Sequence, residues 1–335
     1  MLVITYLFLG GAGAGTLLIL FILDFCTPLA SRARLATQKN SFSELSQAAN
    51  ENRSSIRQLI TSELSSPSDD RKPEHHIYRP QNAFYSFFSP GYQIATATLV
   101  LSSLCLILDL GHPDRILNLY FRPTLSYLSI GTYALTISII CGAFLASIWT
   151  FPQARFSHIV VRIVQGLGIL GSIILIGYTG LLLYSMGTST LLDSILVPLL
   201  FVLSAISCGI ALLFLIAGLS GTTRIFSSTF DRLIKLDTVL LSLELIALAA
   251  FVIWAMLISN SMSDASILLQ GNDTPVLLVL LVCCGLLFPL ILESIRRLRF
   301  ENTVIPIAFA VLVGGFVLRW WFVQIGFPDF VAGVM

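Results

Sequence analysis

Long apolar runs separated by short polar stretches set the pattern of this chain. Eight of these runs contain few charged side chains, and each has the roughly 20 residues that an α-helix needs to cross the hydrocarbon core of a bilayer. They cover approximately residues 2–25, 91–109, 124–149, 158–185, 193–219, 233–259, 275–295 and 303–323. The pattern therefore predicts an all-α integral membrane protein with eight transmembrane helices.

The first apolar run is expected to remain in the protein as a helix. It has no basic start, it exceeds the usual length of a signal-peptide core, and it ends without a small-residue cleavage site.

Only one connection is long and polar. Residues 26–90 are rich in Ser, Asn, Gln and charged side chains, with several prolines near the end. We expect a cytoplasmic loop insertion there, with a surface helix near 41–64. Because the other connections are short, residues 1–335 are predicted to form a single polytopic membrane domain without a soluble catalytic domain.

The composition agrees with a membrane location. Of 335 residues, 56% are hydrophobic and 11% are charged, which is less than half the charged share of a typical soluble domain. The net charge of +1 provides no overall field to attract nucleic acid. The six cysteines contain no C-x-x-C pair, so we interpret them as small core residues rather than as a disulfide set, zinc site or iron–sulfur site.

The basic residues predict the orientation. Sixteen of the 19 Lys and Arg residues fall in the connections on one side of the predicted helices or close to those connections. That side should be cytoplasmic, because Lys and Arg accumulate in cytoplasmic loops. Both termini are therefore predicted to be extracytoplasmic, in a multi-pass protein of the cell membrane.

The histidines argue against a bound haem. A transmembrane b-type haem is usually held by two histidines at membrane depth. The four histidines here are His75, His76, His112 and His158, which lie in the long polar segment or at span ends. They cannot supply such a pair, and no other metal site is predicted.

A few ionisable residues lie within the apolar runs, where they are candidates for function. Together with Tyr178, the acids Asp24, Asp109, Glu244 and Glu293 could form a broken line of proton-accepting groups. Glu244 must face the protein interior, because lipid would not tolerate an unpaired carboxylate. Asp24 is close enough to the interface for solvation to explain it, and we favour that interpretation.

Two further charged residues have alternative explanations. Glu293 precedes Arg296 and Arg297 by three and four residues, so an ion pair on one helix explains it as well as a proton path does. Arg319 precedes Trp320 and Trp321, which favours an interfacial anchor over a ligand or counter-ion role.

Glycines interrupt the first run, in the sequence YLFLGGAGAG. Small residues in a membrane helix usually permit close helix contact, which is the favoured interpretation. Alternatively, a flat ligand ring could lie against the bare backbone at Gly10 and Gly13. Between the second and third runs, a short outward turn places His112 at its tip, on either a docking surface or the rim of a site.

Several motifs in order resemble the NrfD/PsrC family. They are YLFLGGAGAG (6–15), DLGHPDRILNLYFRP (109–123), YTGLLL (178–183) with PLLFVLSAISCGIAL (198–212), and GGFVLRWW (314–321). The resemblance runs from the first span to the last, and the long polar segment is the main departure from it.

The resemblance implies two four-helix bundles, with a menaquinone or menaquinol site near the outer face of the first. It implies membrane lipid, a four-cluster iron–sulfur electron-transfer subunit and a molybdopterin catalytic subunit as partners, and no nucleic acid. Such a subunit would carry neither haem nor an iron–sulfur cluster. It would serve electron transport in anaerobic respiration and would not be catalytic alone towards the terminal substrate.

The resemblance also assigns roles to residues. Tyr178 matches the family tyrosine that contacts the quinone, and Asp109 matches the acid that ends the second helix. Tyr6 matches a position of variable identity that contacts the ring. Glu244, Glu293 and Arg319 match residues of the family's later helices, the second of them on a proposed proton path.

Two interpretations other than a quinone-binding subunit stay open, which makes three in all. Buried Glu244 and the glycine-rich first span would also suit a secondary transporter or ion-translocating protein with a site at the membrane midplane. A purely structural anchor with a degenerate site is the third, and Tyr178 and Asp109 argue against it.

Overall fold

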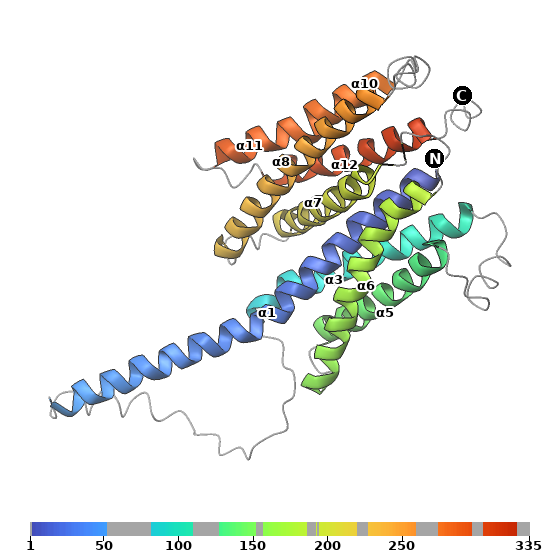
Figure 1. Ribbon diagram of the computed structural model, residues 1–335. Coiled ribbons are helices and arrows are strands. Elements are labelled where there is room, and N and C mark those ends of the chain that lie inside the picture. The colour runs from blue at the N-terminus through green and yellow to red at the C-terminus, as the bar shows by residue number, and fades with distance from the viewer. Residues whose placement is uncertain are drawn as a thin grey trace.

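A computed structural model describes residues 2–51, 82–109, 127–151, 157–185, 192, 194–219, 227–258, 274–296 and 304–326. In these residues the regular structure is helical (Figure 1). The elements are α1 (Leu2–Glu51), α3 (Asn82–Asp109), α5 (Tyr127–Thr150), α6 (His158–Ser185), α7 (Leu196–Leu219), α8 (Ser227–Ile258), α10 (Thr274–Leu280), the π-helix η2 (Leu281–Leu287), α11 (Phe288–Arg296) and α12 (Val304–Gly326).

The prediction of an all-helical protein with eight membrane spans is confirmed. Eight stretches in the described residues are long and apolar enough to cross a bilayer. They are Leu2–Cys26, Phe87–Asp109, Tyr127–Thr150, Ile159–Ser185, Leu196–Leu219, Phe230–Leu257, Pro275–Glu293 and Val304–Gly326. The seventh span is not one regular α-helix, because η2 separates α10 from α11.

The polar segment is helical at both described ends. Helix α1 continues beyond its apolar part as far as Glu51, and α3 begins at Asn82. Figure 1 shows this extension of α1 projecting away from the other helices. Residues 26–40 and 82–90 are therefore helix where the sequence predicted a loop, and residues 41–51 are helix where it predicted the start of a surface helix. Residues 52–81, with most of the expected surface helix, lie outside the described residues.

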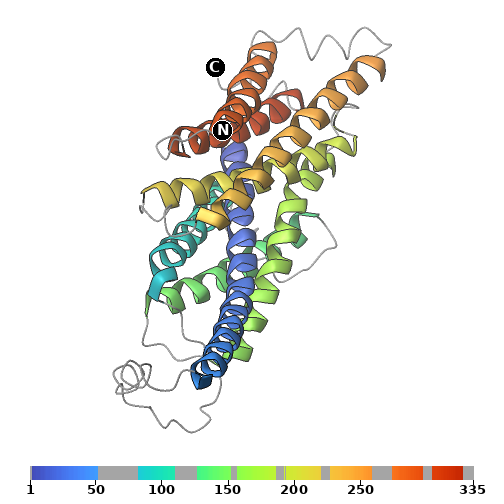
Figure 2. The same ribbon diagram turned by 90° about the vertical axis from the view of Figure 1, so that its left-hand side faces the viewer.

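Helix α1 occupies the centre of the molecule. It packs against α3, α6 and α7, and it also contacts α12 (Figure 2). Glycine makes the contact with α7 close: a Cβ atom at Gly15 would collide with the backbone of Ala205, and one at Gly209 would collide with the backbone of Gly15. This contact favours close packing as the role of the later glycines of the first span.

The remaining helices pack around α1 and α7. Helix α5 packs on α3 and α6, while α8 and α12 pack on α7 and η2 packs on α12. The start of α1 and the end of α12 lie at the same end of the molecule (Figure 1). Which side of the membrane this end faces remains a prediction.

The cysteines only partly match their prediction as core residues. Cys141 and Cys208 are buried and Cys105 is half-buried. Cys26, Cys283 and Cys284 are exposed on helix surfaces, so the prediction is wrong for these three.

Candidate functional site

A narrow gap lies between the first four spans. It is lined by Tyr6 and Gly10 of α1, Ser102 and Leu106 of α3, Gly131 and Leu135 of α5, and Leu175, Tyr178 and Thr179 of α6. The enclosed space admits about one water molecule. A ligand ring would therefore enter only if the surrounding side chains moved. Three residues predicted from the sequence, Tyr6, Gly10 and Tyr178, meet here.

The Tyr178 hydroxyl is the notable polar group of this gap. The residue is 7% exposed, and its Oη atom has no hydrogen-bond partner among the described residues. Its ring lies directly against the Cα atom of Gly131, where a Cβ atom would overlap the ring. An unpaired buried hydroxyl is costly, so Tyr178 is suited to bond a ligand oxygen.

Tyr6 lines the same gap as Tyr178, and Asp109 lies one helical turn beyond the lining residue Leu106 of α3. Tyr6 is buried and interacts electrostatically with both Tyr178 and Asp109. Asp109 is the last residue of α3 and is exposed. The Ser102 hydroxyl donates a hydrogen bond of 2.9 Å to the Tyr6 carbonyl oxygen, which fixes α1 against α3. The gap therefore has two phenols inside and a carboxyl group at its rim.

The other residues predicted for this site have different surroundings. Gly13 packs against Leu99 of α3, where a Cβ atom would come within 2.8 Å of that side chain, and Gly13 does not line the gap. This position supports helix packing rather than ring contact for Gly13. His112 lies outside the described residues.

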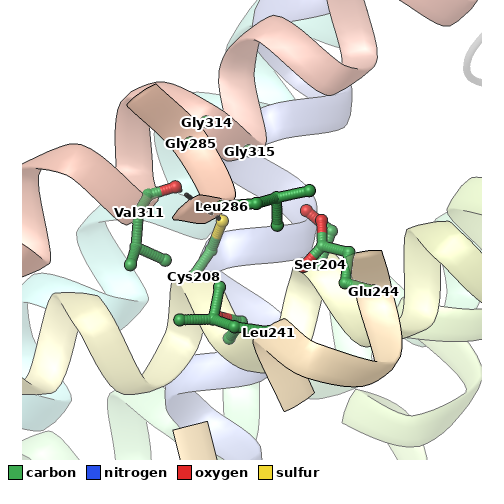
Figure 3. Close-up of a pocket in the computed structure, with 10 residues that line it drawn as sticks. Ser204, Cys208, Leu241, Glu244, Gly285, Leu286, Val311, Gly314 and Gly315 are labelled. Carbon is green, nitrogen blue, oxygen red and sulfur yellow. Dashed lines mark hydrogen bonds between the residues drawn. The ribbon is translucent and has the colours of Figure 1, made fainter. Parts of the chain in front are cut away.

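Glu244 lies in a second gap, between α7, α8, η2 and α12 (Figure 3). It is 3% exposed, which confirms that it faces the interior. Its carboxyl group lies beside the Ser204 side chain, with Cys208 one turn further along α7. The gap is lined by Ser204, Ser207, Cys208, Leu241, Glu244, Gly285, Leu286, Val311, Gly314 and Gly315.

Arg319 is fully buried, so its prediction as an interfacial anchor is wrong. Its Nε atom donates to the Leu7 carbonyl oxygen at 3.2 Å. Its Nη1 atom donates to the Gly315 carbonyl oxygen at 2.6 Å and to the Ser204 hydroxyl at 3.3 Å. Arg319 also interacts electrostatically with Glu244. Because Leu7 follows Tyr6, this side chain connects the two gaps.

The structure reveals one buried acid that the sequence analysis missed. Asp237 of α8 is fully buried and lies within hydrogen-bonding range of Glu293 of α11. The Ser207 hydroxyl donates to Asp237 Oδ1 at 2.8 Å, and the Thr238 hydroxyl donates to Glu293 Oε2 at 2.7 Å. The spacing of Asp237 and Glu244, seven residues apart on one helix face, is the signal that could have identified it.

The ion pair predicted between Glu293 and the following arginines stays a prediction, because the arginine side chains are not described. The side chain of Arg296 and all of Arg297 are outside the described residues. Glu293 itself is 4% exposed, accepts a hydrogen bond from Thr238 and lies beside Asp237.

Asp24 is not solvated, so the interpretation that we favoured for it is wrong. It is 1% exposed, and its Oδ2 atom accepts hydrogen bonds from Tyr92 Oη at 3.2 Å and Trp149 Nε1 at 3.3 Å. These bonds tie α1 to α3 and α5. Asp24 thus belongs with the first spans, whereas Glu244 and Glu293 lie among the later ones.

In the described part of the chain, no group of three or more His, Cys, Asp or Glu side chains is placed to hold a metal ion. Among known families, the polysulphide reductase NrfD model matches residues 75–328, which include the last seven spans. No curated protein matches the chain.

Proposed function

Because the chain belongs to the polysulphide reductase NrfD family, we propose that it is the quinone-binding membrane subunit of a respiratory oxidoreductase complex. The family comprises membrane subunits of molybdopterin and iron–sulfur oxidoreductase complexes, and these subunits interact in general with quinones. Our specific proposal is that this chain exchanges electrons between menaquinol and an extracytoplasmic iron–sulfur subunit.

The observation that carries this proposal is the unpartnered Tyr178 hydroxyl in the gap between α1, α3, α5 and α6. Quinol oxidation releases two protons with two electrons, so a quinol site needs hydrogen-bond partners for the ring oxygens and a base that removes protons. Tyr178 supplies a hydrogen bond to one ring oxygen. Tyr6 lies beside it as a second polar contact, and Gly10 leaves room for the ring.

Asp109 is proposed as the base. It ends α3 at the rim of the gap, close enough to Tyr6 for their electrostatic interaction. An exposed carboxylate there can accept a proton from the quinol and release it to water. In this proposal the rim is extracytoplasmic and faces the iron–sulfur partner, with His112 on the docking side.

Glu244, Glu293 and Arg319 are proposed as a proton path that is separate from the quinone gap. Arg319 bonds Ser204, which lies beside Glu244, and it also bonds α1 next to Tyr6. This arrangement supports a link between quinol oxidation at the quinone gap and the protonation of the buried acids. Asp24 is better explained as a hydrogen-bonded anchor of α1 than as a member of that path.

A secondary transporter is the alternative, and the Glu244 gap is the observation that favours it. A buried acid next to a π-helix and a pair of facing glycines is a feature that an ion-translocating site could use. A plain transporter has no reason to bind a quinone, so quinone binding separates the two functions.

The experiment is to tag the chain, solubilise its native membranes gently, and measure the iron, molybdenum and quinone that copurify. We expect iron, molybdenum and quinone to elute together with the chain from a size-exclusion column, in constant ratios to the chain. A second membrane complex of known composition from the same membranes serves as the control for gentle handling. A lone chain without metal or quinone, while the control complex stays intact, would contradict the proposal and favour the transporter.

A further inference from the structure

Asp237 is a buried acid with an incomplete set of hydrogen bonds. Its Oδ1 atom accepts the Ser207 hydroxyl, whereas its Oδ2 atom receives no hydrogen bond from any described residue. The side chain is fully buried between α7, α8 and α11. An ionised carboxylate there would keep one oxygen desolvated and unsatisfied, which is strongly unfavourable.

The nearest acid, Glu293, makes this situation more unfavourable. The two carboxyl groups lie within hydrogen-bonding range of each other, and two negative charges that close together repel. A single proton between them removes one charge and supplies the missing donor. The pair then consists of one neutral carboxyl group that donates to one carboxylate.

In the described part of the chain, no cation is among the groups that act on Asp237. On α8, Glu244 is a further acid on the same face, whereas Asp231, Arg232 and Lys235 are exposed. On α7 the neighbour is the neutral hydroxyl of Ser207. The described cation of α12, Arg319, already donates to Leu7, Gly315 and Ser204.

We propose that Asp237 and Glu293 form a proton-binding pair that holds one proton between the two carboxyl groups. Ser207 bonds Asp237 on one side and lines the Glu244 gap on the other. Ser204 lies one turn away on α7 and contacts both Glu244 and Arg319. The pair therefore lies next to the Glu244 gap, towards the end of the molecule where α8 begins and α11 ends.

The proton balance of a transfer follows from this arrangement. When the pair passes its proton across the gap to an ionised Glu244, each hydroxyl along the way, that of Ser207 included, gives one proton away and receives one. Both carboxyl groups of the pair are then ionised. This unfavourable state is relieved when a new proton arrives from the end where α8 begins. Proton binding by the pair does not depend on quinone, whereas its use in transport rests on the proposed function.

The test counts protonated carboxyl groups by infrared spectroscopy of the purified chain with any partners that it brings. Spectra are recorded across a pH series in H₂O and D₂O, where the carbonyl stretch of a protonated carboxyl group is recognised by its isotope shift. The wild type is compared with Asp237→Asn/Glu293→Gln, with each single variant, and with Asp231→Asn as an exposed control on α8.

The expected result is that the double variant loses one protonated carboxyl group per chain at neutral pH. The pair should bind its two protons in two separate steps, as strongly coupled acids do. Each single variant should titrate in one step, and Asp231→Asn should match the wild type. A loss of no carboxyl group or of two at neutral pH, or one step that binds both protons, would overturn the proposal.

A conservative variant covers the case in which the double variant does not fold. Asp237→Glu keeps both carboxyl groups, so it should keep the two-step titration with the steps displaced. A single step in this folded variant would overturn the proposal. Because no step of this measurement requires quinol, failure of the pair and failure of the quinone site are distinguishable.

Discussion

At the residue scale, the candidate quinone gap depends on a glycine that faces a tyrosine. The Tyr178 ring lies so close to Gly131 that any side chain there would overlap it. The ring position in turn sets where the unpartnered hydroxyl lies in the gap. Gly131 therefore controls the geometry of the proposed hydrogen bond without contacting the quinone oxygen itself.

Gly131→Ala should displace the Tyr178 ring and weaken quinone binding. A misplaced hydrogen bond loses about 0.5–1.5 kcal/mol, which is up to roughly tenfold in the dissociation constant for a quinone analogue. The measurement is titration of the purified protein with a fluorescent quinone analogue.

Gly177→Ala is the matched control for this variant. It is adjacent to Tyr178, and a Cβ atom at Gly177 would have no heavy atom within 4 Å. We expect wild-type affinity in this control. If Gly131→Ala and Gly177→Ala bind the quinone analogue with equal affinity, Gly131 does not position Tyr178 for quinone binding.

The sequence identified the site residues that apolar surroundings make conspicuous. Tyr178 and Glu244 stand out because polar side chains are rare within apolar runs, whereas Tyr6 was assigned only through the resemblance to the NrfD/PsrC family. Gly131 and Asp237 were missed, because their importance comes from contacts with side chains on other helices. Asp24 and Arg319 were misjudged for the same reason. Their partners are distant in sequence, and a position near the end of a span does not reveal whether other helices cover it.

At the scale of elements, Arg319 joins three helices. Its guanidinium group lies on α12 and bonds the Leu7 carbonyl of α1 and the Ser204 hydroxyl of α7. The rings of Phe8 and Phe201 lie 5.7 Å and 5.6 Å from its Cζ atom, which adds a favourable contact with the cation. Glu244 supplies a nearby negative charge from α8.

Arg319→Met should destabilise the protein by about 3–5 kcal/mol, since the loss of one partner leaves a buried charge uncompensated. Arg319→Met/Glu244→Gln should recover part of this loss, because the remaining acid is then neutral. The measurement is the midpoint temperature of unfolding in detergent.

Arg162→Met is the control for the loss of an arginine that bonds a carbonyl of α1. Arg162 bonds the Phe25 carbonyl oxygen at 2.9 Å from a half-buried position, and its loss should cost about 1 kcal/mol. If Arg319→Met and Arg162→Met unfold at the same temperature, Arg319 does not join the helices as described.

The sequence predicted the helices themselves, except where contacts between helices determine the local conformation. Apolar length predicted the eight spans, because a bilayer-spanning helix must satisfy its own backbone and needs a minimum length. The π-helix η2 was not predictable, because its sequence LVCCGLL is as apolar as the α-helical residues around it. The helical conformation of residues 26–40 was missed because their polar composition resembles that of a loop.

At the scale of the whole molecule, the two gaps lie on opposite sides of the contact between α1 and α7. The first gap belongs to α1, α3, α5 and α6, and the second to α7, α8, η2 and α12. Arg319 bridges them through α1. This arrangement could not be derived from the sequence, because apolar length gives the number of helices but not which of them are neighbours.

The most direct test of the account is the rate at which menaquinol reduces the iron–sulfur clusters of the intact complex. Wild type and Tyr178→Phe are purified with equal iron content, mixed rapidly with menaquinol, and followed by the bleaching of cluster absorbance. We expect Tyr178→Phe to be slower by about 10²-fold, the usual cost of one lost donor to a reacting oxygen. Asp109→Asn should be slower by about 10²–10⁴-fold, the usual contribution of a general base. Cluster reduction at the wild-type rate in both variants would contradict the assignment of the quinone site.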